Sequence, residues 1–223
     1  MGSTEAVILD IDGTLVDSNY QHTIAWQRAF RDVGFTADAW RIHRCIGMGG
    51  DQIVTTLLGE ETENEHGEAI REAEAHRYSS LIDEVVPFDG AHGLIAGLKE
   101  RGLTVVLASS AKEEEVEHYV EILDAGALHD GYTSAADVDA TKPDPDLIHA
   151  AITKAGGGDI LMVGDSVWDI EAASRAGIDA IGVLCGGFGE AELSGAGAKA
   201  VVESIMDVSP EIQSGRPGSD HER

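Results

Sequence analysis

From residue 87 onward, short apolar runs alternate with longer stretches whose apolar residues recur at helical spacing. The short runs have the length and β-branched content of buried strands, and the longer stretches are typical of amphipathic helices. We expect strands at residues 103–108, 131–133, 159–163 and 180–184, an edge strand at 198–202, and helices at 91–101, 113–123, 146–155 and 169–176. Such alternation requires crossover connections, so the pattern predicts a doubly wound parallel sheet in an α/β core.

The N-terminal part of the chain has a different pattern. One apolar run at residues 7–9 predicts a buried strand, and no strand pattern follows between residues 16 and 85. Helical spacing predicts a first helix that begins after Ser18 as N-cap and ends at Gly34. Further helices are expected at residues 37–45, 51–58 and 62–82.

Changes in composition indicate where the domains begin and end. Pro87 and Gly90 stand three residues apart where the alternating pattern begins, as in a linker. The last fifteen residues contain Pro, Gly, Ser and charge but almost no apolar side chain, which is typical of disorder. We therefore predict a Rossmann-like core (residues 1–16 and 87–208), an inserted all-helical cap domain (17–86) and a disordered tail (209–223).

The charge of the chain restricts its possible partners. Fifteen Lys and Arg residues oppose 41 Asp and Glu residues, a formal net charge of −26, so we expect neither nucleic acid nor an anionic membrane as a partner. There is no apolar run of about 18 residues and no basic region that leads into an apolar one, so a cytoplasmic protein is expected. Cys45 and Cys185 have no metal-finger spacing and are expected to be reduced. The sequence leaves monomer and homodimer open.

Polar residues follow the ends of three predicted strands. These residues are Asp10 and Asp12, then Ser109 and Ser110, and finally Asp165 with Asp169 four positions later. Because ligands of open parallel sheets bind beyond the carboxyl ends of the strands, these side chains are expected at one site. A simple turn at Asp12 and Gly13 is the alternative explanation for the first pair. Lys142, one of only five lysines, precedes a proline and a further predicted helix.

In these residues the chain resembles the haloacid dehalogenase-like phosphohydrolases. That family has an Asp-x-Asp motif, a Ser or Thr at a strand end, a Lys, and a Gly-Asp-x-x-x-Asp motif, and all four occur here in order, within a resemblance from about residue 6 to residue 202. The resemblance implies that Asp10 is the nucleophile that forms an aspartyl-phosphate and that Asp12 is the general acid and base. It also implies that Ser109 donates to a phosphoryl oxygen and that Lys142 neutralises phosphoryl charge.

The resemblance also implies a metal site. Mg²⁺ takes an octahedron of oxygens, usually from one or two carboxylates with substrate phosphate and water. Asp10, the backbone carbonyl of Asp12, and Asp165 would hold it, and Asp169 would bind through water or support the other ligands. A protein of such negative charge needs local positive charge to bind a phosphate, and Mg²⁺ with Lys142 would supply it. Dehalogenases of the superfamily lack the second acid, so Asp12 favours phosphoryl transfer.

Further candidates lie near the entrance to the predicted cap. His22 and Trp26 are four residues apart on one helical face. This spacing resembles β-phosphoglucomutases, in which a histidine at this position helps to position the acid and base; a partly exposed helix histidine is an equally good interpretation. Ser110 is an additional candidate for substrate contact.

A glycine-rich loop at residues 44–51 falls where the family places its substrate-specificity loop. Gly47 and Gly50 would allow close approach of a ligand, although a flexible turn explains them too. The mutases carry a phosphate-binding arginine where this chain has Gly50, so mutase activity is not favoured. Arg44 and Arg77 are the candidates to replace that arginine.

We therefore predict an enzyme, a Mg²⁺-dependent phosphatase that acts on a small phosphorylated metabolite and resembles phosphoglycolate phosphatases or sugar phosphatases. A β-phosphoglucomutase-like isomerase is the alternative within the superfamily. A binding or regulatory module without catalysis is the alternative of another class, and the complete set of motif residues argues against it.

Overall fold

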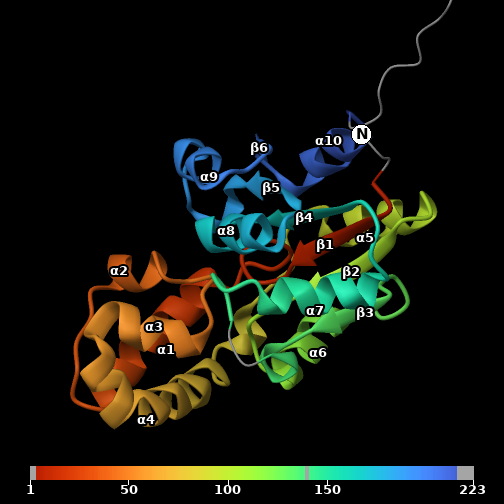
Figure 1. Ribbon diagram of the computed structural model, residues 1–223. Coiled ribbons are helices and arrows are strands. Elements are labelled where there is room, and N and C mark those ends of the chain that lie inside the picture. Colours follow the sequence, from red (N-terminus) through yellow and green to blue (C-terminus); the bar gives the residue numbers. More distant parts are fainter. Residues whose placement is uncertain (1–3, 139–140, 215–223) are drawn as a thin grey trace, which may run out of the picture.

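The computed structural model describes residues 4–138 and 141–214. Its centre is a six-stranded parallel sheet with the strand order β3-β2-β1-β4-β5-β6 (Figure 1). The strands are β1 Ala6–Asp10, β2 Thr104–Ala108, β3 Gly131–Thr133, β4 Ile160–Gly164, β5 Asp179–Val183 and β6 Ala200–Val202. The chain adds strands outward from β1, returns to place β4 on the other side of β1, and continues outward to β6. The predicted doubly wound α/β core is therefore confirmed, and its strand order reverses between β1 and β4.

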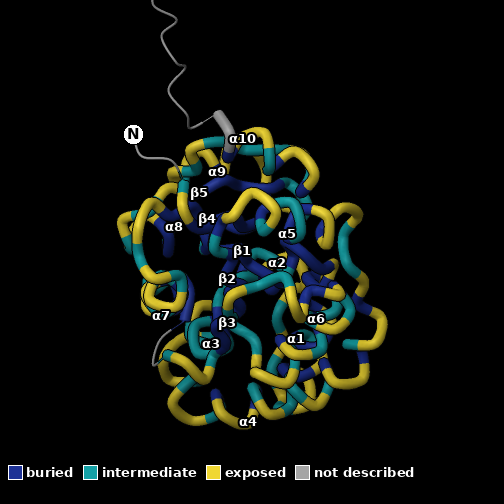
Figure 2. Tube along the Cα trace, turned by 90° about the vertical axis from the view of Figure 1, so that its right-hand side faces the viewer, coloured by how far each residue is buried: buried dark blue, intermediate teal, exposed yellow. Residues whose placement is uncertain are grey.

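Helices cover both faces of the sheet. Successive side chains of a strand point to opposite sides, so a strand whose side chains are all apolar gives both faces an apolar surface that must be buried. Val7 and Leu9 of β1 face the hydrophobic layer beneath α5, α6 and α10, whereas Ala6 and Ile8 face the layer beneath α7, α8 and α9. These helices are α5 Ala91–Glu100, α6 Glu113–Ile122, α7 Asp146–Ala155, α8 Val167–Ala176, α9 Glu190–Ala196 and α10 Val208–Ser214. Figure 2 shows the strands as the buried centre of the molecule.

The helices expected between the first strand and residue 86 are present. They are α1 Asn19–Asp32, α2 Ala39–His43, α3 Gly50–Leu58 and α4 Glu60–Tyr78, followed by a 3₁₀ turn at Ile82–Glu84. We call α1 to α4, residues 19–78, the cap helices. They stand beside the sheet as a separate group (Figure 1), around their own hydrophobic cluster, which includes Trp26, Phe30 and Ile70. Their independence as a domain stays a prediction.

The two chain segments that join the cap helices to the core run side by side. Val16 forms an antiparallel bridge with Pro87. The backbone N–H of Asp17 donates to the carbonyl of Val86 at 2.9 Å. The paired segments therefore lie next to each other at the base of the cap helices.

The C-terminal segment corrects the sequence analysis. The tail expected to be disordered from residue 209 continues as α10, and its Ile212 is buried together with Val208 in the layer beneath α5. Two apolar residues four positions apart suffice to dock one helical turn, and the polar composition of the segment hid them. Residues 215–223 lie outside the described part of the chain. Within residues 4–138 and 141–214, no helix combines the length and the apolar character that crossing a bilayer requires.

Candidate active site

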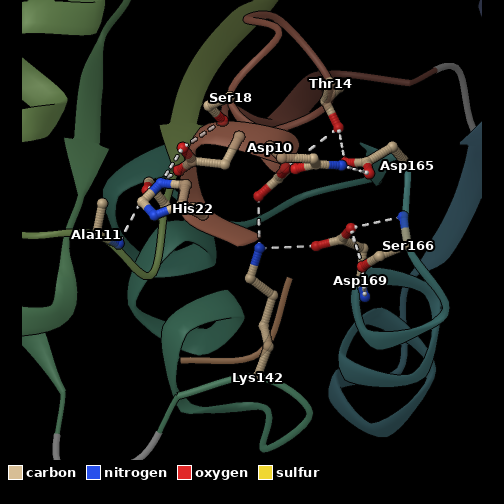
Figure 3. Close-up of polar contacts among 12 residues, drawn as sticks. Asp10, Thr14, Ser18, His22, Ala111, Lys142, Asp165, Ser166 and Asp169 are labelled. Atoms are coloured by element: carbon tan, nitrogen blue, oxygen red, sulfur yellow. Dashed lines mark hydrogen bonds and ion pairs between the residues drawn. The ribbon is translucent and has the colours of Figure 1, made fainter. Parts of the chain in front are cut away.

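Three carboxylates meet where the strand order reverses. Asp10 ends β1, Asp165 directly follows β4, and Asp169 lies in the first turn of α8 (Figure 3). All three are buried, and one oxygen of each lies within 4.8 Å of the others. Thr14 donates its hydroxyl to Asp10 Oδ2 at 3.1 Å and to Asp165 Oδ1 at 2.8 Å. The Asp-x-Asp and Gly-Asp motifs are thus brought together as the strand-end argument expects.

This cluster has the chemistry of a cation site. Burial and the charge of Asp169 raise the pKa of Asp10 well above its usual range and raise the pKa of Asp165 to about 7. Buried carboxylates that repel one another in this way are stabilised when a divalent cation is placed among them. Their oxygens are the hard ligands that Mg²⁺ and Ca²⁺ prefer.

The first residue of the cap helices also reaches this cluster. Asn19 donates its Nδ2 to Asp165 Oδ2 at 3.1 Å and to the carbonyl of Gly186 at 3.2 Å. Gly13 makes this approach possible, since a Cβ at that residue would lie 2.4 Å from Asn19 and 2.6 Å from Asp165. Its φ of +78° independently favours glycine.

Lys142 bridges two of the carboxylates. Its Nζ donates to Asp10 Oδ1 at 2.5 Å and to Asp169 Oδ1 at 2.7 Å, and only 2% of the side chain is exposed. Burial by itself would lower the pKa of Lys142, but the two carboxylates outweigh burial and raise it. The second oxygen of Asp169 accepts from the hydroxyl and backbone N–H of Ser166, so Asp169 also caps α8.

Asp12 accepts three hydrogen bonds. Ser109 donates its hydroxyl to Oδ2 at 2.7 Å, Ser18 donates to Oδ1 at 2.8 Å, and His22 Nε2 lies 3.3 Å from Oδ1. Burial would raise the pKa of Asp12, but the contacts with His22, Ser109 and Ser18 outweigh it and lower the pKa to about 2. Ser18 precedes α1 as expected, yet its hydroxyl makes no cap hydrogen bond because Asp12 accepts it.

His22 stands between two acids. Its Nδ1 lies 3.3 Å from Glu74 Oε1, opposite the contact with Asp12, and its ring stacks on Tyr78 with centroids 3.7 Å apart. Burial would lower the pKa of His22, but Asp12 and Glu74 raise it to about 10, so the imidazole is protonated at neutral pH. The histidine predicted from its spacing therefore does contact the second aspartate of the motif. Glu74 gave no signal in the sequence, because α4 is rich in acids.

A cavity of about 310 Å³ lies between the cap helices and the end of the sheet. Asp10, Asp12 and Lys142 line it from the core, and His22 and Trp26 line it from α1. Its volume is at the lower end of the range for small-molecule sites. Other lining residues come from the expected loop, from α4 and from the segment after β2: Gly47, Gly50, Asp51, Arg71, Glu74, Ser110, Lys112 and Glu115.

Comparison with known proteins identifies the family of the chain. A sequence model described as haloacid dehalogenase-like hydrolase matches residues 7–183. The chain belongs to this family. The crystal structure of a hydrolase from Pseudomonas syringae superposes with a TM-score of 0.88 at 33% identity, and the superposition covers 96% of this chain and 100% of that one.

Two curated relatives differ in the reactions that their names describe. The β-phosphoglucomutase of Bacillus subtilis is 28% identical over an alignment of 221 positions that covers 93% of each chain. A phosphoglycolate phosphatase of Colwellia psychrerythraea is 27% identical over an alignment of 192 positions that covers 82% of this chain and 85% of that one. The chain is therefore a hydrolase-family enzyme whose relatives include both phosphatases and a phosphomutase.

The structure brings the two serines after β2 into different surroundings. Ser109 donates to Asp12 and accepts the backbone N–H of Ala111 at 3.0 Å. The Ser110 hydroxyl is buried, lines the cavity and has no hydrogen-bond partner in the described part of the chain. Of the two hydroxyls, that of Ser110 is the one left available to a ligand of this haloacid dehalogenase-like enzyme.

The two arginines expected to grip substrate lie outside the cavity lining. Arg77 donates to both oxygens of Asp32 on the outer side of α1, at 2.7 and 2.8 Å. Arg44 pairs with Glu192, with its guanidinium carbon 3.9 Å from the centroid of Phe188. The structure does not bring these two arginines to the cavity, because each guanidinium pairs with an acid outside its lining.

Two cations that the sequence analysis missed do line the cavity: Arg71 of α4 and Lys112, which precedes α6. Lys112 stands two residues after Ser110 and could have been found from its place behind the strand-end motif. Arg71 could not, since nothing local distinguishes it from its neighbours on α4.

Proposed function

We propose that the chain is a Mg²⁺-dependent phosphoric monoester hydrolase that acts on a small phosphorylated metabolite through an aspartyl-phosphate on Asp10. The observation that carries this proposal is the position of Asp10 in the cavity, with Lys142 Nζ 2.5 Å from Oδ1 and Asp165 close by. A carboxylate held at a strand end, beside a buried cation and an acid–histidine pair, suits attack on phosphorus.

The chain's own residues account for both half-reactions. A carboxylate oxygen of Asp10 attacks phosphorus while the bond from phosphorus to the alcohol oxygen breaks, and Lys142 and the Ser110 hydroxyl stabilise the phosphoryl oxygens. Asp12 is ionised at rest, so the proton for the departing oxygen comes from the protonated His22, whose Nε2 lies 3.3 Å from Asp12 Oδ1, and Asp12 passes it on as the oxygen leaves. Water then attacks phosphorus, Asp12 takes its proton, and the bond from phosphorus to Asp10 breaks, which releases phosphate.

Mg²⁺ fits the carboxylate cluster as the required cation. When bound, it neutralises charge on the carboxylates and on the phosphoryl group. Asp10, Asp165 and the backbone carbonyl of Asp12 would hold it, and Asp169 would act on Lys142 and on the start of α8. This assignment is supported by the raised pKa values of Asp10 and Asp165, which a cation would reverse.

Phosphomutase is the second candidate. The Bacillus subtilis relative carries that name, and the contact between His22 and Asp12 suits the positioning role expected of a mutase hinge. A mutase must keep water from the aspartyl-phosphate while its intermediate reorients. The family model that matches the chain describes a hydrolase, which favours hydrolysis.

One experiment separates the candidates. Phosphate release is measured for a panel of phosphorylated metabolites, including phosphoglycolate and hexose phosphates, beside a coupled assay for conversion of β-glucose 1-phosphate to glucose 6-phosphate with a bisphosphate activator present. We expect phosphate release that Asp10→Asn abolishes and no conversion. Conversion faster than release would establish the mutase. Binding of esters without release or conversion would establish a binding module.

We expect no nucleic acid or membrane partner at a net charge of −26, and a cytoplasmic monomer or homodimer.

A further inference from the structure

Arg71 enters the cavity over a glycine. It lines the cavity from α4, and a Cβ added to Gly50 of α3 would lie 3.4 Å from Arg71 Cδ and 3.4 Å from Trp26 Cζ2. A longer side chain at residue 50 would therefore compete with Arg71 for the same space. The missing side chain at Gly50 leaves room for a guanidinium that comes from another helix.

A second glycine fixes the direction of that guanidinium. Glu63, Gly67 and Arg71 follow one another at intervals of four residues on one face of α4. Although Glu63 and Arg71 start about 12 Å apart along the helix axis, Arg71 Nη1 lies 2.7 and 2.9 Å from the two oxygens of Glu63. A Cβ at Gly67 would lie 2.5 Å from the Glu63 carboxylate, so the ion pair can lie flat across the helix only because residue 67 has no side chain.

The ion pair with Glu63 engages only Nη1 of the Arg71 guanidinium. Within residues 4–138 and 141–214, no hydrogen bond engages Nε or Nη2, and 34% of the side chain is exposed. These two nitrogens form the edge of a guanidinium that binds a carboxylate or a phosphate through two parallel hydrogen bonds. Two acids that line the same cavity have other partners, since Glu74 contacts His22 and Asp51 accepts from Thr141.

We propose that Arg71 determines specificity, and that the substrates are phosphomonoesters which carry a second anionic group, a carboxylate or another phosphate, at the end away from Asp10. This inference rests on the proposed function. A protein with 41 acidic residues repels such a polyanion unless a cation meets each of its charged ends, and Lys142 and Arg71 stand on the core side and the cap side of one cavity.

The test compares three esters in Arg71→Met and in a matched control. The esters are 2-phosphoglycolate, glucose 1,6-bisphosphate and glycerol 3-phosphate, of which the last has no second anionic group. The control is Arg77→Met, which removes a cation from the same helix but outside the cavity lining. We expect Arg71→Met to lower kcat/KM for whichever doubly anionic ester the wild type prefers by about tenfold to a hundredfold, mainly through KM. The loss of kcat/KM for glycerol 3-phosphate should be at least about tenfold smaller. Arg77→Met should leave the ratios of kcat/KM among the three esters unchanged.

A preference for 2-phosphoglycolate would identify a carboxylate as the second group, and a preference for the bisphosphate would identify a phosphate. Equal losses for all three esters in Arg71→Met would overturn the proposal.

A binding measurement keeps this test independent of catalysis. Calorimetry with Asp10→Asn, alone and combined with Arg71→Met, gives the affinities of the same three esters without turnover. The quantity compared is the ratio of the affinity for the preferred doubly anionic ester to the affinity for glycerol 3-phosphate. If the wild type released no phosphate from any ester, the proposed hydrolase activity would be wrong, whereas the role of Arg71 would still be decided by this affinity ratio. Gly67→Ala adds a positioning test: it should displace the Glu63 carboxylate and reduce the ratio, while alanine keeps the helix stable. An unchanged ratio in Gly67→Ala would show that the ion pair with Glu63 does not orient Arg71.

Discussion

Thr141 donates both its hydroxyl and its backbone N–H to the carboxylate of Asp51, the N–H at 3.4 Å. Asp51 belongs to the first turn of α3, whereas Thr141 directly precedes Lys142. The backbone N–H of Gly49 adds a contact to the carbonyl of Lys142 at 3.4 Å. The loop of the cap helices that lines the cavity is therefore fastened to the segment that carries Lys142.

Asp51→Ala should weaken this fastening. Asp51 holds α3 against Thr141 at the wall of the cavity, so loss of the acceptor should raise KM for phosphate release by about threefold to tenfold, with a smaller change in kcat. Steady-state kinetics on the preferred ester measures both values. Asp38→Ala, at an exposed acid beside α2 without a side-chain cap bond, is the control. Equal KM values in the two variants would show that the contact with Thr141 does not affect the cavity.

Removal of the divalent cation should stop the reaction. Without it, Asp10 and Asp165 repel each other and the incoming phosphate, so excess chelator should lower phosphate release by at least about a hundredfold. Added Mg²⁺ should restore it in the wild type but not in Asp165→Asn. Full turnover in chelator would contradict the metal assignment.

Lys142→Met should cost stability as well as activity. Loss of the buried cation leaves Asp10 and Asp169 close together without compensation, and we expect a decrease of about 3–5 kcal/mol in the free energy of unfolding. Urea denaturation measures this decrease. Lys154→Met, which breaks a partly exposed pair with Asp137, should cost at most about 1 kcal/mol. Addition of Asp10→Asn to Lys142→Met should recover part of the loss; a further loss would disprove charge repulsion as its cause.

Glu115 should make stability depend on pH. Burial, assisted by Glu74 and Asp12 and opposed by His22 and Lys112, raises the pKa of Glu115 from 4.5 to about 7. The folded state then holds a proton that the unfolded state has lost, so stability falls as pH rises from 4.5 to 7 and stays lower above that range.

Glu115→Gln removes this titration. The melting temperature of Glu115→Gln minus that of the wild type should increase from pH 5 to pH 8, as measured by calorimetry. Glu114→Gln changes an exposed acid next to it and should show no such trend. A constant difference across this range would place the pKa of Glu115 near its ordinary value.

The sequence predicted the core of the site because parallel strands deliver their ends to one edge. Asp10 ends β1, and Ser109 and Asp165 directly follow β2 and β4, the two neighbours of β1 in the sheet. Apolar runs of this kind can be recognised one at a time, and their convergence then follows from the fold class. His22 was found in another way, from a spacing that resembles the β-phosphoglucomutases.

Other parts of the site depend on contacts that no local pattern contains. Glu74 and Arg71 lie on α4, where charged residues are frequent, and only the packing of α4 against α1 and α3 shows which of them face the cavity. Arg44 and Arg77 were chosen for their charge, but the position of a partner acid decides where a long side chain rests. The docking of α10 through Ile212 was missed for a related reason, since one buried side chain barely changes the composition of a polar tail.

Asn19 connects two equilibria that are usually considered apart. It is the first residue of α1, and it donates to the carboxylate of Asp165. A rotation of the cap helices that withdraws Asn19 would remove a donor from an oxygen of the cation site and change the affinity of that site for its ion. By thermodynamic reciprocity, the ion must then change the balance between open and closed cap helices by the same factor. Cation concentration would thereby set how often the cavity admits an ester, in addition to enabling its cleavage.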